Sequence, residues 1–282
     1  MSFIGRETEL SILEQQYGRP GGQLFVVYGR RRVGKTALLN RFCMGKPHVY
    51  FTASQSATRD NLHQFAAICQ RFLNRPEMQT VEFKTIEGLL QYLNGCAGPE
   101  KLVIVLDEYQ YWAGGDPSLG SLIQRFWDHS GKQSNVMLVL CGSYISLMVD
   151  YALAERSPLY GRRSGQLHVL PFDYRTAARF FPQWSYKDRL MAYGILGGIP
   201  AYLEQFDSSM SLPQNILENL LAKGTFLNEE ATFLLKTELR DTRMYTSILR
   251  AIAAGNTSLK DLASKLGMEG RALSPYLSNL QG

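Results

Sequence analysis

One glycine-rich run near the N-terminus has the residue types and spacing of a phosphate-binding loop. Residues 29–36 read G-R-R-R-V-G-K-T and fit the Walker A pattern G-x-x-x-x-G-K-[ST]. The run follows the apolar segment 24–28 and opens into the helical pattern of residues 36–43, a context that favours this motif over an incidental glycine-rich turn. Backbone N–H groups in such a turn, together with the positive end of the helix dipole, bind phosphate oxygens. The run therefore predicts a bound nucleotide.

Two side chains of this run can contact a triphosphate and its metal ion. Lys35 can reach the β- and γ-phosphates, and the Thr36 hydroxyl can ligate Mg²⁺. Because three adjacent arginines crowd a single phosphate site, we expect at least one of them to pair with an acidic neighbour and not with ATP. The nucleotide-binding residues predicted from this run are Gly29, Arg30, Arg31, Arg32, Val33, Gly34, Lys35, Thr36 and Ala37.

An apolar strand that ends in two acids is the second chemical signal. Residues 102–106 read L-V-I-V-L and precede Asp107 and Glu108, as in a Walker B element. Asp107 would hold Mg²⁺, directly or through water, and Glu108 would act as general base towards the attacking water. Alone, a buried strand followed by two solvated acids explains the segment equally well. Beside a phosphate-binding loop at the same sheet edge, the magnesium and base roles are favoured.

A further strand and an arginine pair complete the predicted catalytic set. The apolar segment 136–141 ends in Gly142-Ser143. In nucleoside triphosphatases that insert a strand between the phosphate-binding loop and the Walker B strand, the end of that strand carries a polar residue between water and γ-phosphate, and Ser143 takes this position. A serine in an ordinary strand-end turn is the alternative. Arg162 and Arg163 could supply positive charge to the γ-phosphate of a neighbouring subunit. The alternative for this pair is a surface position bound to helix carboxylates. The catalytic residues predicted are Lys35, Glu108, Ser143, Arg162 and Arg163.

The N-terminal segment offers a surface for a nucleobase. Phe3 and Ile4 could cover an adenine face, with Gly5 and Arg6 approaching through their backbone. A capped N-terminal helix explains the same residues, so the segment alone leaves both interpretations open.

These residues need a sheet whose strands end at one edge, and the hydrophobic pattern predicts one. Continuous apolar strands that alternate with amphipathic helices are typical of a parallel sheet covered on both faces, so we expect a doubly wound α/β domain. The strands predicted are residues 24–28, 48–51, 102–106, 136–141 and 166–170, and the helices 36–43, 59–73, 85–94 and 119–129.

The pattern changes after residue 171, where every periodic segment is helical. We expect an ATPase core over residues 1–171, an all-helical lid over 172–240 and a partial winged-helix domain over 241–282. In the last of these, Pro275 fits the first turn of a helix better than its interior. The helices predicted after residue 171 are 174–181, 186–196, 200–206, 212–221, 229–237, 243–254, 258–266 (capped by Thr257 or Ser258) and 271–280.

Composition narrows the class of protein. The chain has 282 residues, 45% of them hydrophobic, and a formal net charge of +5, which permits contact with nucleic acid without establishing it. The four cysteines have no C-x-x-C spacing, so we expect reduced thiols and neither disulfides nor zinc. With no signal peptide and no run near the roughly 18 apolar residues of a membrane span, we expect a cytoplasmic protein without membrane contact.

Together the motifs resemble the archaeal-type ATPase family within the AAA+/STAND P-loop proteins. The resemblance covers about residues 2–280 and rests on F-I-G-R-E-x-E-L, V-Y-G-R-R-R-V-G-K-T, V-L-D-E-Y-Q-Y, L-C-G-S-x-I-S-L-M, S-P-L-Y-G-R-R and G-G-I-P-x-Y-L in this order. It implies a five-stranded ATPase core, a helical lid and a winged helix.

The resemblance also assigns further nucleotide contacts. It implies that Ile4, Gly5 and Arg6 lie along the adenine, and that the segment Gly198-Ile199-Pro200 faces the nucleotide at the start of a lid helix, adding Ile199 and Pro200 to the site. No lid arginine is expected, because this segment replaces it. From the residues alone, Gly197–Pro200 is a helix N-terminal turn with proline at the first helical position. Relatives usually continue into a further, often nuclease-like domain, which these 282 residues lack, so we expect a fragment or a shortened relative.

The leading prediction is an ATP-binding, Mg²⁺-dependent ATPase that acts as a nucleotide-driven switch. The first alternative is a DNA-binding regulatory protein that holds ATP as a ligand with little hydrolysis, since residues 236–282 carry seven Lys and Arg against four acids. A P-loop small-molecule kinase is disfavoured, because it has little need for a Glu directly after Asp107. The partners expected are ATP or ADP, DNA through the C-terminal helices, and a second copy or another protein, since Arg162 and Arg163 acting in trans would require one.

Overall fold

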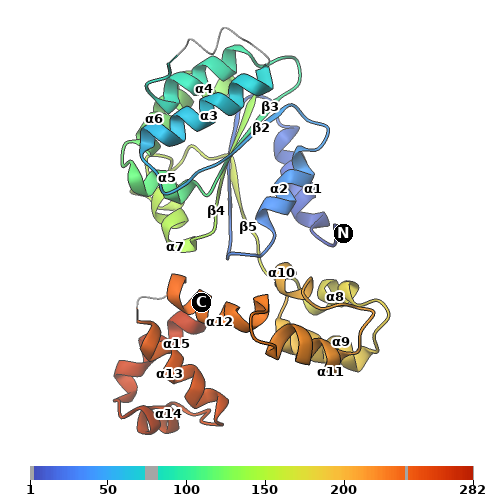
Figure 1. Ribbon diagram of the computed structural model, residues 1–282. Coiled ribbons are helices and arrows are strands. Elements are labelled where there is room, and N and C mark those ends of the chain that lie inside the picture. Colours follow the sequence, from blue (N-terminus) through green and yellow to red (C-terminus); the bar gives the residue numbers. More distant parts are fainter. Residues whose placement is uncertain (1–2, 74–81, 239–240, 282) are drawn as a thin grey trace. The chain divides into compact units, whose positions relative to one another are not determined.

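A computed structural model of the chain describes residues 3–73, 82–238 and 241–281 (Figure 1). The chain forms two compact units, which divide between Glu204 and Gln205. The division into core, lid and winged helix stays a prediction from the sequence. None of the described helices is both long enough and apolar enough to span a membrane.

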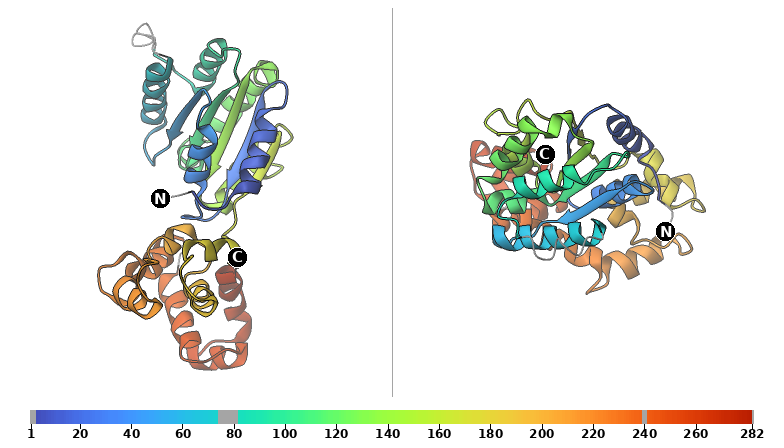
Figure 2. Two further views of the ribbon diagram at one scale, coloured as in Figure 1. Left: turned by 90° about the vertical axis from the view of Figure 1, so that its right-hand side faces the viewer. Right: turned by 90° about the horizontal axis from the view of Figure 1, so that it is seen from above.

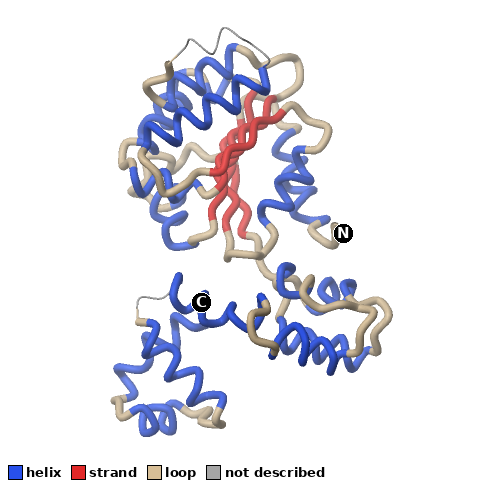
Figure 3. The backbone as a smooth tube through the Cα atoms, in the orientation of Figure 1, coloured by secondary structure: helices blue, strands red, loops and turns tan. Residues whose placement is uncertain are grey.

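The first unit is built on a parallel sheet of five strands, as predicted. The strands, coloured red in Figure 3, are β1 (Gln23–Tyr28), β2 (His48–Thr52), β3 (Leu102–Asp107), β4 (Val136–Gly142) and β5 (Gly165–His168). Their order in the sheet is β2-β3-β4-β1-β5. Every residue of β3 and β4 is buried, which explains their unbroken apolar sequences. Because β4 lies between β1 and β3, the phosphate-binding loop, the acidic pair and Ser143 all follow the same edge of the sheet.

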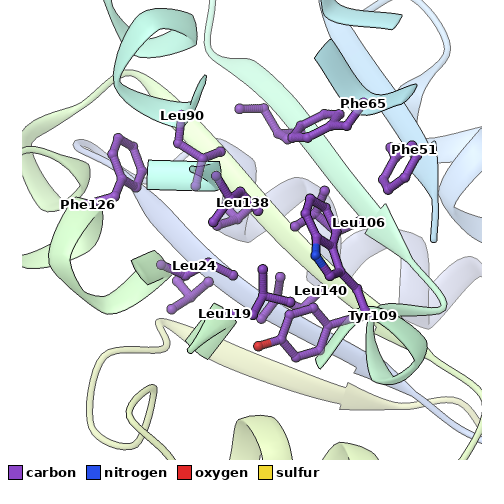
Figure 4. Close-up of a cluster of buried hydrophobic side chains, with 14 of the residues drawn as sticks. Leu24, Phe51, Phe65, Leu90, Leu106, Tyr109, Leu119, Phe126, Leu138 and Leu140 are labelled. Atoms are coloured by element: carbon purple, nitrogen blue, oxygen red, sulfur yellow. The ribbon is translucent and has the colours of Figure 1, made fainter. Parts of the chain in front are cut away.

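Helices cover both faces of this sheet. One face packs against α1 (Glu7–Tyr17) and α2 (Lys35–Cys43), which face the viewer in the left-hand view of Figure 2. The other face packs against α3 (Thr58–Leu73), α4 (Ile86–Gly95), α5 (Tyr109–Gly115) and α6 (Leu119–His129). The side chains of this second layer interlock with the strands around Leu106, Leu138 and Leu140 (Figure 4). A short 3₁₀ turn, η2 (Gly131–Gln133), leads into β4.

The rest of the first unit is helical apart from β5. After β4 come α7 (Ile145–Met148) and the π-helix η3 (Val149–Leu153), and after β5 come α8 (Tyr174–Ala177), the 3₁₀ turn η4 (Ala178–Phe180), α9 (Tyr186–Leu196) and α10 (Pro200–Leu203). Asp173 caps α8 by accepting from the Thr176 N–H, and Ser185 caps α9 in the same way. The single helix predicted over residues 174–181 is therefore a short α-helix that tightens into a 3₁₀ turn.

The second unit contains α11 (Leu212–Asn215), the π-helix η5 (Ile216–Leu221), α12 (Phe226–Glu238), α13 (Thr242–Ala253), α14 (Leu259–Leu266) and α15 (Gly270–Gln281). The last three share a small core of Ile248, Ala251, Leu262 and Leu273. Ser258 caps α14, one of the two caps predicted, and Gly267 ends it with a φ of 65°. Pro275 lies inside α15 and not in its first turn. Packing of Leu273, Tyr276 and Leu277 into the core outweighs the local cost of that proline.

Candidate active site

The loop between β1 and α2 has the glycine geometry that the Walker A pattern predicts. Gly34 has a φ of 93° and immediately precedes α2, so it takes a backbone conformation that other residues reach only with strain. A Cβ atom on Gly29 would lie 2.3 Å from the Val169 carbonyl oxygen, which restricts this position to glycine. The loop therefore delivers the N-terminus of α2 to the edge of the sheet, where backbone N–H groups can bind an anion.

Lys35 is held inside this loop by the backbone. Its Nζ donates to the carbonyl oxygens of Gly29 and Arg30, both at 2.9 Å, and the residue is only 6% exposed. Burial lowers the pKa of Lys35, while the nearby Asp107 and Glu108 act in the opposite direction. An ammonium group has three N–H donors, so these two bonds still allow a third to a phosphate oxygen.

Asp107 and Thr36 meet as a metal site requires. The Thr36 hydroxyl donates to Asp107 Oδ2 at 3.1 Å, and Tyr50 from β2 donates to the same oxygen at 2.7 Å. Among the described residues there is no cluster of three or more His, Cys, Asp or Glu that could hold a metal. One carboxylate and one hydroxyl fit Mg²⁺, which binds proteins through one or two carboxylates plus phosphate oxygens and water. Burial, followed by the charge of Asp107, raises the pKa of the Tyr50 hydroxyl.

Glu108 and Ser143 lie together, and a glutamine joins them. Ser143 Oγ donates to Glu108 Oε2 at 2.7 Å. The side-chain amide of Gln110 also donates to Glu108 Oε2, and it approaches Ser143 Oγ at 3.3 Å. Glu108 itself has a φ of 52°, a left-handed conformation that is costly for a residue with a side chain. The predicted base and the predicted polar residue after β4 are thus in direct contact.

Arg31 is bound to tyrosines. Its Nη2 donates to the Tyr111 hydroxyl at 2.5 Å, and its guanidinium lies 5.0 Å from the centroid of the Tyr144 ring. Tyr111 follows Glu108 by three residues and Tyr144 directly follows Ser143, so Arg31 links the phosphate-binding loop to both segments that carry predicted catalytic residues. An acidic partner for one of the three loop arginines stays a prediction.

The N-terminal segment and the turn before α10 gather beside the loop. Gly5 and Arg6 have φ values of 73° and 70°, and Arg6 donates to the Val33 carbonyl oxygen at 2.8 Å. The Arg6 guanidinium also lies 4.1 Å from the centroid of the Phe172 ring. A hollow at this place is lined by Phe3, Ile4, Arg6, Gly34, Ala37, Phe172, Phe180, Pro200 and Glu204. This set brings together Ile4, Arg6, Gly34, Ala37 and Pro200 of the predicted site.

Ile199 lies at the N-cap of α10, directly before Pro200. The turn that carries both residues is fixed to the segment after β5, because the Phe172 N–H donates to the Gly198 carbonyl oxygen at 2.7 Å. A Cβ on Gly198 would lie 1.8 Å from the Phe172 oxygen, so this close approach requires glycine. The role of Ile199 towards a nucleotide stays a prediction.

Arg162 and Arg163 both have partners within the chain. Arg162 donates to the carboxylate of Asp128 on α6 through Nε and Nη2, at 3.0 and 2.8 Å. This hydrogen bond lowers the pKa of Asp128. Arg163 donates to the Leu153 carbonyl oxygen at 2.8 Å and stacks near Tyr160. The contact of Arg162 with Asp128 matches the alternative given in the sequence analysis, an arginine bound to a helix carboxylate. A role of Arg162 and Arg163 at a neighbouring subunit stays a prediction.

Several contributors to the site were not predicted as part of it. They include Tyr50, which binds Asp107, Gln110, which binds Glu108, Phe172, which stacks on Arg6, and the two tyrosines that bind Arg31, Tyr111 and Tyr144. Gln110 had the clearest signal, because it lies two residues after the acidic pair. The four cysteines are free thiols, and burial raises the pKa of Cys141 beside the site.

Residues 3–206 match the family described as the ATPase domain predominantly from Archaea. The chain belongs to this family. An uncharacterized protein of Methanocaldococcus jannaschii is 33% identical over 280 residues, which are 99% of the chain. The chain spans 60% of the length of that relative. An uncharacterized ATP-binding protein of the same organism is 43% identical over 44 residues, 16% of the chain and 75% of that protein.

Solved structures agree with this archaeal ATPase fold. The Walker-type ATPase of Pyrococcus abyssi has a TM-score of 0.69 at 23% identity, over 99% of the chain and 89% of that protein. The ORC2 protein of Aeropyrum pernix, solved as ADPNP–ADP complexes, has a TM-score of 0.59 at 14% identity, over 98% of the chain and 80% of that protein. At these identities the likeness shows the fold. With the family match and the loop geometry, the chain is an ATP-binding ATPase domain of the P-loop class.

Proposed function

We propose that the chain binds Mg·ATP, hydrolyses it and uses the bound nucleotide as a switch. The observation that carries the proposal is the arrangement of two polar pairs at one sheet edge. The Thr36–Asp107 pair offers oxygen ligands, and the Glu108–Ser143 pair offers a base with a hydroxyl neighbour. A protein that only stored nucleotide would have no need of the second pair.

Each side chain has a distinct part in this reaction. Lys35 and the N–H groups of residues 29–36 would bind the β- and γ-phosphates, and Thr36 with Asp107 would hold Mg²⁺. Bound there, Mg²⁺ would neutralise charge on the phosphate oxygens. Glu108 would accept the proton of the attacking water, and Ser143 would hold its carboxylate. The nucleobase of ATP would lie in the hollow lined by Ile4, Arg6, Ala37 and Pro200.

The switch proposal rests on how α10 is connected. Pro200 opens α10 and lies against the loop, since a Cβ on Gly34 would be 3.6 Å from Pro200 Cγ. The first unit ends four residues later, at Glu204. A change in the loop on ATP binding therefore acts on the last helix before the second unit.

Mg²⁺-dependent ATP turnover by the wild type, Lys35→Ala and Glu108→Gln tests the proposal. We expect Lys35→Ala to lose nucleotide affinity and Glu108→Gln to keep it while kcat falls on the order of 10²-fold. If the wild-type protein turns over slowly, single-turnover kinetics still measure its rate of ATP hydrolysis. Equal rates in all three proteins would contradict hydrolysis at this site.

DNA binding by the second unit is a second candidate function. Five cations on α13, α14 and α15 are exposed, namely Arg243, Arg250, Lys260, Lys265 and Arg271. The α14–Gly267–α15 arrangement has the order of a helix–turn–helix. The ORC1 protein of Aeropyrum pernix, solved in complex with DNA, has a TM-score of 0.50 at 16% identity over 99% of the chain and 84% of that protein.

A further inference from the structure

We infer that Gln110 is the positioning residue of the proposed hydrolytic site. Its side-chain amide would hold the Glu108 carboxylate and the Ser143 hydroxyl in one arrangement. The inference rests on the proposed function of Glu108 as general base. It adds a residue to that site and states how the base is oriented.

The hydrogen bonds around Glu108 converge on a single oxygen. Ser143 Oγ donates to Oε2 at 2.7 Å, and the Gln110 amide donates to the same Oε2. Two donors on one oxygen fix the plane of the carboxylate and leave Oε1 to accept the proton of water. The third contact, between the amide nitrogen of Gln110 and Ser143 Oγ at 3.3 Å, closes the triangle.

The burial of Gln110 shows that this amide is built into the site. Gln110 is 1% exposed, and its Oε1 is buried without a hydrogen-bond partner in the described part of the chain. Leaving a buried acceptor unpaired costs stability, and an apolar side chain of the same shape would avoid that cost. Turning the amide over would place its oxygen against the Glu108 carboxylate. The orientation with both N–H donors towards Glu108 and Ser143 is thus the one that the charge selects.

Strand β4 leaves room for this amide at one residue. A Cβ on Gly142 would lie 2.2 Å from Gln110 Oε1 and 2.4 Å from Met148 Sδ. Glycine directly before Ser143 therefore lets the amide lie against the end of β4. The same Cβ would lie 2.6 Å from Met148 Cγ, so alanine at residue 142 would displace both the Gln110 amide and the Met148 side chain.

Gln110→Met tests the inference, because it keeps the length of the side chain and removes both amide donors. We expect kcat for ATP to fall on the order of 10-fold, while KM for ATP and the affinity for a fluorescent ATP analogue stay within about 2-fold. Gly142→Ala should give the same split by displacing the amide. Gln23→Met is the matched control, since Gln23 is also buried and donates to two carbonyls, but at the first residue of β1, away from the loop.

A double-mutant cycle with Glu108→Gln shows whether Gln110 acts through Glu108. We expect Gln110→Met to have no further effect on kcat in the Glu108→Gln background, whereas a general loss of structure would slow both backgrounds alike. Equal kcat for wild type and Gln110→Met, or full additivity in the cycle, would overturn the inference. If Glu108→Gln hydrolyses ATP as fast as wild type, the proposed role of Glu108 as general base is wrong. This outcome differs from those that contradict the positioning role of Gln110. Gln110→Leu, which also removes both donors and adds no charge beside Glu108, gives the same test should Gln110→Met not fold.

Discussion

Asp107 accepts more hydrogen bonds than its predicted role as a magnesium ligand requires. Thr36 and Tyr50 both donate to Oδ2, and Oδ1 accepts the backbone N–H of Glu108 at 2.9 Å. Of these three donors, Tyr50 lies on the neighbouring strand β2, in which Thr52 pairs with Asp107 of β3. A phenol that orients a ligating carboxylate affects metal binding without touching the metal.

Tyr50→Phe measures this effect at the scale of one hydroxyl. We expect the Mg²⁺ concentration for half-maximal ATP hydrolysis to rise about 10-fold, because the carboxylate loses the donor that fixes its rotamer. The affinity for nucleotide without Mg²⁺ should not change. Tyr17→Phe is the control, since Tyr17 also donates from a hydroxyl, to the Lys101 carbonyl oxygen at 3.0 Å. An unchanged Mg²⁺ requirement in Tyr50→Phe would exclude the orienting role.

At the scale of elements, the sequence was most informative where one signal dominated. Unbroken apolar runs located β1, β3 and β4, and α6 and α9 have the predicted bounds, because their apolar residues recur at helical spacing. The strand predicted over residues 166–170 is shorter and lies at Gly165–His168. The segments 174–181 and 212–221 were predicted as single helices, yet they change to 3₁₀ or π geometry partway. Such changes depend on packing and caps that periodicity does not encode.

The site could be predicted for residues in contiguous motifs and not for those brought in by the fold. Lys35, Thr36, Asp107 and Glu108 follow from two short patterns. Tyr50 is 57 residues from Asp107, and their contact depends on the register of β2 against β3. Phe172 reaches Arg6 only because β5 joins the edge of the sheet beside β1. Strand order and register are set by the whole sheet, so no local sequence pattern predicts the contacts of Tyr50 with Asp107 and of Phe172 with Arg6.

The proposed DNA binding by α14 and α15 can be tested through its dependence on salt. If these helices bind DNA, affinity for a duplex should fall with salt, and replacing Lys260 and Lys265 together by alanine should weaken binding and reduce the salt slope by about one per lost phosphate contact. Lys187→Ala, an exposed cation on α9 of the first unit, is the control. Absence of binding at about 50 mM salt, where phosphate contacts are strong, would contradict DNA binding by this chain.

For the whole molecule, the question is whether nucleotide state reaches the second unit. A ligand shifts a conformational equilibrium only by its difference in affinity for the two states, so the loop must differ between them. Two contacts connect the loop to its surroundings: Pro200 lies against Gly34, and Arg31 binds Tyr111 and Tyr144, which neighbour the proposed catalytic pair Glu108 and Ser143. Of these, only the Pro200 contact leads into α10 and so to the junction at Glu204.

Hydrogen exchange of the intact chain with and without Mg·ATP tests this coupling. We expect slower exchange in residues 29–36 and 200–203, and a change of at least about 5-fold in the segment 205–221, because coupling between sites is typically worth that much. Lys35→Ala should show none of these changes, since it does not bind the triphosphate. Protection that stops at Glu204 in a protein that binds and hydrolyses ATP would show a self-contained ATPase unit and contradict the switch. Matching changes in 205–221 would instead make the second unit the output of the nucleotide site.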